Sequence, residues 1–339
     1  MFWLANATHF FWEDQAVSNA EISRSSDRGP LARLIVVAAM ACFFLSLASP
    51  AFKAAAGESQ LTFKTPEAAA EALVEACRKD DTKSLERILG ADGNELLYSG
   101  DEAQDKASRQ VFAQASDEML KVLKSGPDRM VIQVGKNNWA MPIPIVKVGK
   151  SWHFDTAAGM EELLDRRIGH DELDAIQVCR AYVQAQREYV SKDHDADEVL
   201  EYAQRIASTP GQADGLYWPG TGEGERSPMG PLAAEAAKEG FAEKTPAGAS
   251  APYHGYYYKI LTGQGPNAPG GAYSYVINGN MVAGFALLAY PAQYASTGIV
   301  TFLVGPNGIV YQKDLGLKTE DVVKNLNVYD PDTTWKKAD

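Results

Sequence analysis

The residues whose types and spacing best fit a chemical role are a run of acidic side chains in the middle of the chain. Residues 193–201 read Asp-His-Asp-Ala-Asp-Glu-Val-Leu-Glu. Carboxylates at alternate positions converge when a loop wraps a hard cation, as at the first, third and fifth positions of a calcium loop. The run therefore offers these candidate calcium ligands: Asp193, Asp195, Asp197 and Glu201.

Two positions depart from the calcium pattern. Glu198 stands where the loop needs Gly for its sharp turn, and Gln204 stands where a bidentate carboxylate would close the site. The same run is also typical of a junction between two helices, where an Asp caps a helix and the helix dipole favours negative charge. The sequence alone does not decide between a calcium site and a helix cap.

A second group of candidates is aromatic and lies in a Gly- and Pro-rich part of the chain. Tyr and Trp side chains on a β-sheet stack on sugars or peptides and supply rigid contact area at low entropy cost. The candidate ligand-binding residues are Tyr217, Trp218, Tyr253, His254, Tyr256 and Tyr257. The Gly-rich residues 263–271 and Tyr273 follow them, without the Lys-Ser/Thr of a phosphate-binding loop. In the alternative, alternate tyrosines of one strand simply face a core.

Motifs of the common enzyme classes are absent from the sequence. It contains no Gly-x-Ser-x-Gly, no His-Glu-x-x-His and no Cys with a recognisable His partner. The histidines at 153, 170, 194 and 254 are too widely separated to match a metal-ligand spacing. The sequence predicts no catalytic residue, and no cofactor apart from the calcium considered above.

Residues 24–57 predict that the chain is exported. Three arginines within residues 24–33 precede a 14-residue apolar run at 34–47, and small residues follow around Ala51 and Ala56. A membrane-spanning helix needs about 20 apolar residues, whereas this length is typical of a signal-peptide core. We expect residues 1–56 to be an extension plus signal peptide, and the mature chain to be periplasmic or secreted without a membrane span. A short membrane anchor is the alternative.

Charge and cysteine content limit the partners and the covalent structure. The net charge of −12 argues against nucleic acid and anionic lipid as partners, because both require a cationic surface. Two cysteines, Cys77 and Cys179, remain after removal of the signal. In an oxidising compartment they form either a disulfide or two buried thiols, and the sequence does not distinguish these.

The elements that must position the candidate residues follow from periodicity. Thr65 and Pro66 begin a helix, a second helix ends at Gly90, and a third is expected over 101–123. Alternating apolar residues then predict strands at 130–134, 143–148 and 151–155. Helices followed by an antiparallel meander indicate an α+β domain over 60–156.

The second half of the chain is expected to begin with helices and to end with a sheet. Connecting helices are predicted within residues 157–206, at 158–167 and 171–191. Residues 207–252 are a Gly/Pro-rich loop region with one short helix at 232–239. Residues 253–335 form an antiparallel β domain with these predicted strands: 255–261, 281–291, 299–304 and 309–314. The overall fold class is α+β.

Three resemblances extend this interpretation. The helix "TPEAAAEALVEACRKDD", the helix "SLERILG" and the hairpin "IPIVKVGKSWHFD" resemble the NTF2-like (cystatin-like) architecture, in which a helix packs into a curved sheet and often leaves a conical pocket. That resemblance implies Tyr98, His153 and Asp155 as candidates for a catalytic pair in the cone. The order "HGYYYKIL", "GFALLAYPAQYASTGIVTFLVGPNGIVYQKD" is similar to the C-terminal sheet of type IV pilins, although the long N-terminal pilin helix is missing.

Residues 60–335 as a whole resemble DUF2950, a family of uncharacterised exported bacterial proteins. The resemblance rests on "PIPIVKVGKSWHFDTAAG", "RRIGHDELDAIQVCRAYVQAQREY" and "PYHGYYYKILTGQGPNAPGGAYSYVINGNMVAGFALLAYPA". It implies a location in the envelope or outside the cell, and no known activity. The sequence thus favours an exported, non-catalytic protein that binds an unknown envelope protein or a cell-wall-derived ligand. The alternatives are an enzyme (hydrolase or lyase) using the NTF2-like cone, and a pilin-related assembly protein.

Overall fold

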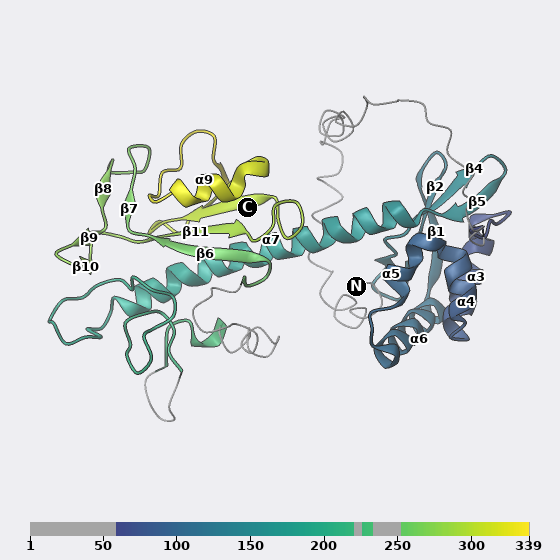
Figure 1. Cartoon of the computed structure of the whole chain (residues 1–339), viewed down its shortest axis with the longest axis horizontal. Coiled ribbons are helices and arrows are strands. Elements are labelled where there is room, and N and C mark those ends of the chain that lie inside the picture. The colour runs from purple at the N-terminus through teal and green to yellow at the C-terminus, as the bar shows by residue number, and fades with distance from the viewer. Residues whose placement is uncertain (1–58, 220–225, 233–251, 339) are drawn as a thin grey trace, which may run out of the picture. The chain divides into compact units, whose positions relative to one another are not determined.

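The computed structural model describes residues 59–219, 226–232 and 252–338, and shows a mixed α+β chain (Figure 1). The predicted signal peptide lies outside these residues, as does the short helix predicted at 232–239 except for its first residue, Leu232. The chain divides into two compact units, unit 1 ending at Leu164 and unit 2 beginning at Asp165. In the described part of the chain, no helix has the length and apolar character that a membrane crossing requires.

Helices form the first part of unit 1. Helix α3 (Pro66–Arg78) begins as predicted, with the Thr65 hydroxyl accepting a hydrogen bond from the Ala68 N–H. The helical segments that follow are α4 (Thr82–Leu89), η1 (Ala91–Gly93), α5 (Asn94–Leu97) and α6 (Glu102–Glu118). Gly90 ends α4 with φ of 77°, a backbone conformation that favours glycine.

The third predicted helix is shorter than expected. Helix α6 ends at Glu118, and β1 (Leu120–Gly126) follows in place of its last turn. Val122 lies opposite Ile132 in the hairpin formed with β2 (Arg129–Val134). Pairing with β2 places Leu120 and Val122 against the core, and this gain outweighs a helical spacing that is only a weak local preference.

Unit 1 contains an antiparallel sheet in the order β1-β2-β4-β5, with β3 (Trp139–Ala140) also paired to β2. The remaining strands are β4 (Ile145–Val148) and β5 (Ser151–Phe154). Alternate residues Ile132, Val134, Ile145 and Phe154 face the helices and join their core. The opposite face of the sheet contributes no residue to that core.

The two helices predicted at 158–167 and 171–191 are one continuous helix, α7 (Thr156–Tyr189). The expected break at 168–170 does not occur. A glycine inside a helix costs about 1 kcal/mol, and burial of Ile168, Ala175 and later residues outweighs the cost of Gly169. The division between the two units falls within this helix.

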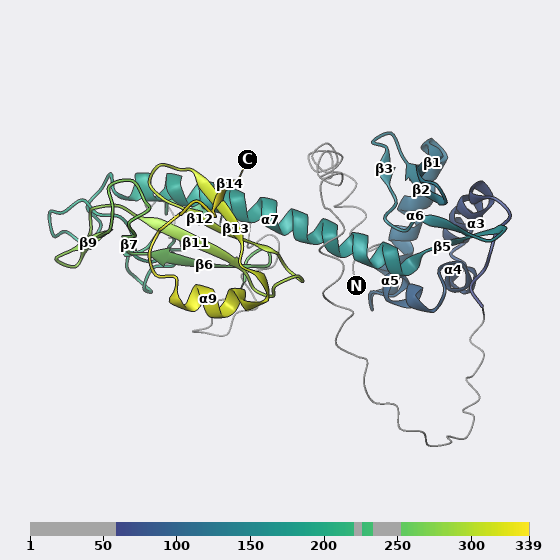
Figure 2. The ribbon, with the colours of Figure 1, turned by 90° about the horizontal axis from the view of Figure 1, so that it is seen from above.

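Unit 2 is built on a five-stranded antiparallel sheet in the order β14-β13-β12-β11-β6. Its strands are β6 (Tyr256–Leu261), β11 (Ala286–Pro291), β12 (Val300–Val304), β13 (Val310–Asp314) and β14 (Lys336–Lys337). The predicted hairpin of β12 and β13 is confirmed. The C-terminal part of α7 runs beside the sheet in both views (Figures 1 and 2), and its buried face shares one core with the strands and with α9 (Thr319–Asn325).

Two small hairpins precede β11. One joins β7 (Gly263–Gln264) to β8 (Tyr273–Ser274), and the other joins β9 (Val276–Ile277) to β10 (Asn280–Met281). The single strand predicted over 281–291 is therefore two strands with an interruption. The interruption contains Gly284, where a Cβ would lie 2.8 Å from carbons of the Tyr275 ring and where φ is 153°, so this position requires glycine.

The two cysteines are free thiols. Cys77 lies in the core of unit 1, and Cys179 lies in the separate core of unit 2. Burial raises the pKa of each thiol to about 12, so neither is a reactive thiolate. Of the two possibilities left by the sequence, the structure shows two buried thiols.

Candidate functional site

The acidic run after α7 forms a loop that its own side chains hold in shape. Asp193 accepts hydrogen bonds from the backbone N–H groups of Asp195, Ala196 and Glu198, at 3.2, 2.8 and 3.0 Å. Partial desolvation acts against ionisation, but these hydrogen bonds favour the carboxylate and lower the pKa of Asp193. The loop is thus ordered by protein groups alone.

Three of the four predicted calcium ligands lie together. Carboxylate oxygens of Asp193, Asp195 and Asp197 are within 4.8 Å of one another, and all three side chains are exposed. Desolvation and the neighbouring Asp197 carboxylate raise the pKa of Asp195. Glu201, the fourth predicted ligand, instead accepts a hydrogen bond from the Met281 N–H at 2.9 Å.

The helix-cap interpretation of this run is wrong. The described residues from 193 to 219 contain no helix. Residues 197–204 instead pair with the β9–β10 hairpin through side chains and backbone. Asn280 donates to Asp197, Tyr202 N–H donates to the Met281 carbonyl, and Gln204 donates to the Gly279 carbonyl. Of these, the Tyr202 bond uses a backbone N–H that a helix would need for its own hydrogen bonds.

His194 connects the acidic loop with the predicted aromatic residues. Its ring stacks on Tyr189 with a centroid distance of 4.0 Å and meets Trp218 edge-on at 5.7 Å. Tyr217, beside Trp218, is held by backbone hydrogen bonds to Ile206 and Ser208. The structure thereby brings Trp218 to His194, which stands between two of the calcium candidates, a proximity that the separation in the sequence does not reveal.

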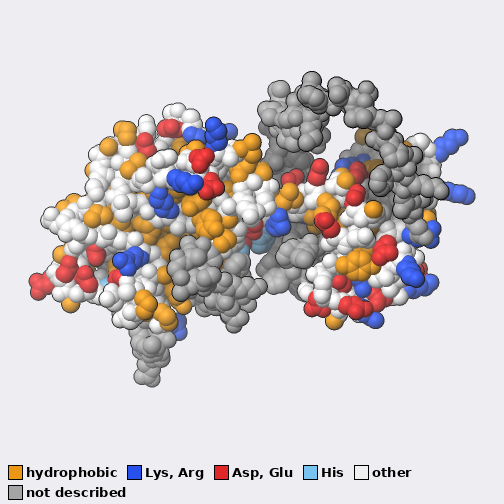
Figure 3. All heavy atoms as spheres, in the orientation of Figure 1, with side chains coloured by type: hydrophobic (Ala, Val, Ile, Leu, Met, Phe, Trp, Pro, Cys, Tyr) orange, Lys and Arg blue, Asp and Glu red, His pale blue; other side chains and the backbone are white. Residues whose placement is uncertain are grey.

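Exposed apolar side chains accompany these carboxylates. Leu200 is 55% exposed, Ile277 51% and Val282 38%. They belong to the two segments that the hydrogen bonds above join, 197–204 and 276–282. Asp and Glu side chains gather at the end of unit 2 where β9 and β10 lie (Figures 1 and 3). We call residues 193–204, Trp218 and residues 276–282 together the acidic end.

A buried glutamine fixes the acidic end to α7. Gln186 is fully buried, and its amide donates to the Ala203 carbonyl at 2.8 Å and accepts from the Ala203 N–H at 2.9 Å. The same amide donates to the Tyr182 hydroxyl, which in turn donates to the Ala286 carbonyl of β11. From the sequence, the only sign of this role is a polar residue within an apolar helical stripe.

The other predicted aromatic residues lie elsewhere in unit 2. Tyr256 is fully buried, and its hydroxyl donates to the Val300 carbonyl, which excludes it from any binding surface. The Tyr257 ring packs on the Tyr290 ring, with the ring centroids 5.7 Å apart. Tyr253 lies against His254, whose Nδ1 is 3.0 Å from Oδ2 of Asp174. Asp174 and Tyr189 are fifteen residues apart on α7, or about 22 Å at 1.5 Å per residue, so the six candidates form two separate groups.

Asp174 faces two histidines. Oδ2 of Asp174 lies 3.0 Å from Nδ1 of both His170 and His254, yet neither contact has hydrogen-bond geometry. Neighbouring Asp171 lies against Gly255, and burial raises its pKa to about 6. These residues do not bring three ligand atoms close enough together to match a metal site.

The Gly-rich segment 263–271 is a loop held from within. The buried amide of Gln264 donates to the carbonyls of Pro269 and Gly271 and accepts from the Tyr275 hydroxyl. Asp330 accepts hydrogen bonds from the backbone and side chain of Asn267. The loop is therefore ordered, and exposed Tyr273 follows it.

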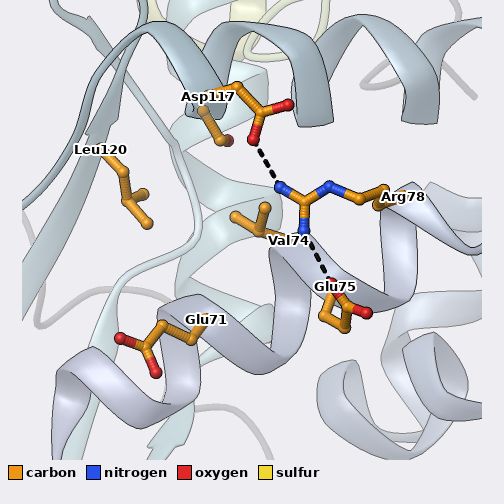
Figure 4. A pocket seen from close by; sticks show the side chains of 7 residues that line it. Glu71, Val74, Glu75, Arg78, Asp117 and Leu120 are labelled. Carbon is orange, nitrogen blue, oxygen red and sulfur yellow. Dashed lines mark hydrogen bonds and ion pairs between the residues drawn. The ribbon is translucent and has the colours of Figure 1, made fainter.

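Unit 1 has a hollow between α3, the end of α6 and β1 (Figure 4). The Arg78 guanidinium forms an ion pair with Glu75 of the same helix, at 2.6 Å between nitrogen and oxygen. It forms a second ion pair with Asp117 near the end of α6, at 2.5 Å. Its lining residues are Glu71, Val74, Glu75, Arg78, Ser116, Asp117 and Leu120.

The residues implied by the NTF2-like resemblance do not line this hollow. The Tyr98 hydroxyl donates to Glu86, and the Asp155 carboxylate accepts from the Ala158 N–H at the start of α7. His153 lies on β5 opposite Val146. Each of the three residues thus has a different partner, and none of them lines the hollow.

The described residues thus define a mixed α+β protein of two units, with ordered acidic and apolar loops at one end of the second. The chain belongs to the family described as "Protein of unknown function (DUF2950)", whose model matches residues 60–338. No curated protein and no solved structure matches the chain.

Proposed function

We propose that this protein is exported and acts as a non-catalytic binding protein whose partner docks on the acidic end. The observation that carries the proposal is the exposure of Leu200, Ile277 and Val282 beside ordered carboxylates. Removing apolar surface from water is favourable by about 25 cal/mol per Å². Exposed apolar side chains grouped on a surface are therefore typical of interaction sites.

The acidic end is already in a fixed conformation. The carboxylates of Asp193, Asp197 and Glu201 accept hydrogen bonds that hold its loops, and the Gln186 amide donates another. A surface that is ordered before binding loses less conformational entropy when a partner docks, so more of the contact energy appears as affinity. This order supports recognition of a protein partner or of a cell-wall-derived ligand.

Export is supported by the sequence of residues 24–57 alone. An apolar run of signal-peptide length follows three arginines and precedes small residues. Substituting Asp within this run, as in Val37→Asp, is expected to retain the full-length protein in the cytoplasm. Cell fractionation of the wild type and the variant tests this, and equal amounts outside the cytoplasm would remove the support for export.

Catalysis by unit 1 receives no support from the residues considered for it. Tyr98, His153 and Asp155 have separate structural contacts and do not share the hollow. The enzyme alternative would need other residues, and we therefore favour binding.

The binding proposal is tested by capture from an envelope extract. Tagged mature protein, beginning at residue 57, is compared with the variants Trp218→Ala and Ile277→Asp. The matched control is Val328→Asp, which alters an exposed valine outside the acidic end. The proposal expects the two variants, but not the control, to lose a partner that the wild type retains. Recovery of the same proteins by all four would show that the acidic end is not the binding surface.

A further inference from the structure

The sheet of unit 1 has one face that no described helix covers. Side chains alternate along a strand and directly paired residues share a face, so the register defines the members of this face. Leu123 pairs with Val131, and Arg129 pairs with Val146. With Lys121 and Val148, which lie on the same face by alternation, these residues make up what we call the open face.

The open face is apolar and basic. Val148 is 66% exposed and Leu123 42%, and none of its four apolar residues belongs to the core of unit 1. Lys121 and Arg129 are both exposed. Residues 120–154 carry six basic residues and one acidic residue, and two of the basic residues, Lys121 and Arg129, lie on the open face itself, although the chain has a net charge of −12. The sheet is thus a positive region on a negative protein.

The acidic end has the opposite charge and a similar apolar content. Residues 192–201 carry five acidic residues and one lysine, beside exposed Leu200, Ile277 and Val282. The two surfaces therefore carry charges of opposite sign, and both have exposed apolar side chains that a contact would bury. Complementary potentials of this kind fix the register of a docked pair and disfavour other partners.

We propose that the open face of one copy of this protein docks on the acidic end of a second copy. This inference rests on the proposed binding surface and names its occupant. The two patches differ, so the contact is heterologous: each copy keeps one unused patch, and successive copies add head to tail. The long-range repulsion between chains of charge −12 is screened beyond about 8 Å at physiological ionic strength, which leaves the local attraction.

The test is the mass of the mature protein in solution, measured by sedimentation velocity over a range of protein concentrations. We expect the mass to rise above that of a monomer with concentration, and the association to weaken about tenfold or more between about 0.05 and 0.5 M NaCl. Two charge-reversed variants are compared, Lys121→Glu/Arg129→Glu and Asp195→Lys/Glu198→Lys. All four side chains are exposed, and thermal melts verify that both variants fold. Lys64→Glu/Lys83→Glu, on exposed positions outside the open face, is the matched control.

Each charge-reversed variant alone is expected to be a monomer, whereas the control is expected to associate like the wild type. Mixing the two variants restores opposite charges at every contact and should restore association. A wild type that stays monomeric up to about 1 mM at low salt overturns the proposal. Association of either variant alone at wild-type strength, or a mixture that stays monomeric, overturns it as well. If self-association fails while Ile277→Asp still loses a partner from extract, this inference is wrong and the proposed function stands.

Discussion

Gln186 provides the most direct test of how the acidic end is held. The substitution Gln186→Leu keeps the side-chain size and removes both hydrogen bonds to Ala203. Ala203 is buried, so its N–H and carbonyl would be left without partners. Each unpaired buried group costs about 1–3 kcal/mol, and burial of the added methyl groups offsets part of this. We expect a loss of about 3 kcal/mol from the free energy of unfolding of unit 2.

This loss has a measurable size. For a unit of about 150–250 residues, 1 kcal/mol corresponds to about 2–4 °C, so the melting temperature of unit 2 should fall by about 6–12 °C. Calorimetry of the mature protein measures the transition. Hydrogen exchange followed by mass spectrometry should show faster exchange in a peptide covering 200–206 and unchanged exchange in one covering 66–78.

Gln184→Leu is the matched control, because Gln184 lies on the exposed face of the same helix. It should change the free energy of unfolding by less than about 0.5 kcal/mol. If Gln186→Leu were as stable as this control, or if exchange at 200–206 were unchanged, Gln186 would not hold the acidic end and the reasoning would be refuted.

Three further predictions concern acidic residues. Burial raises the folded-state pKa of Asp171 to about 6, above an unfolded value of about 3.9. The contribution of Asp171 to the free energy of unfolding is therefore fully present below pH 4 and is lost as the pH rises through 6. Asp171→Asn should therefore leave stability unchanged at pH 4 and raise it by about 1 kcal/mol at pH 8, a figure reduced for partial exposure; equal effects in urea melts at both pH values would contradict this. Asp193→Ala removes the acceptor of three backbone N–H groups and should speed hydrogen exchange at 195–198, whereas exchange at the wild-type rate would show that the loop does not depend on it. The calcium prediction expects a melting temperature that rises in millimolar calcium for the wild type and not for Asp195→Asn/Asp197→Asn; an unchanged wild-type melt would rule the site out.

Local sequence was sufficient where a single segment contained the whole signal. Thr65 and Pro66 fixed the start of α3, because a hydroxyl acceptor and a preset φ act within one turn. The hairpin of β12 and β13 was likewise predicted from two apolar runs around Gly305-Pro306-Asn307-Gly308. Residues 120–123 were misassigned, because their spacing fits a helix and only their pairing with β2 makes them a strand.

The candidate site was partly visible from sequence. The spacing of Asp193, Asp195 and Asp197 predicted that their carboxylates would converge, and they do. Glu201 was expected beside them, but its hydrogen bond to Met281 holds it on the β9–β10 hairpin. His194 was noted only as an isolated histidine, although its ring lies between Tyr189 and Trp218. The contacts of Glu201 with Met281 and of His194 with Trp218 join different segments of the chain. Periodicity and spacing describe single segments and do not predict such contacts.

The sequence by itself determined the α+β class, the negative charge, the family and most individual helices and strands, because these depend on composition or on interactions within a few residues. Only the tertiary structure decided which residues meet. It separated Tyr253, His254, Tyr256 and Tyr257 from Trp218, buried Tyr256, and joined the segment that contains Leu200 to residues 276–282. The physical reason is that a surface is formed by long-range hydrogen bonds and shared burial, and both depend on how the segments fold against one another.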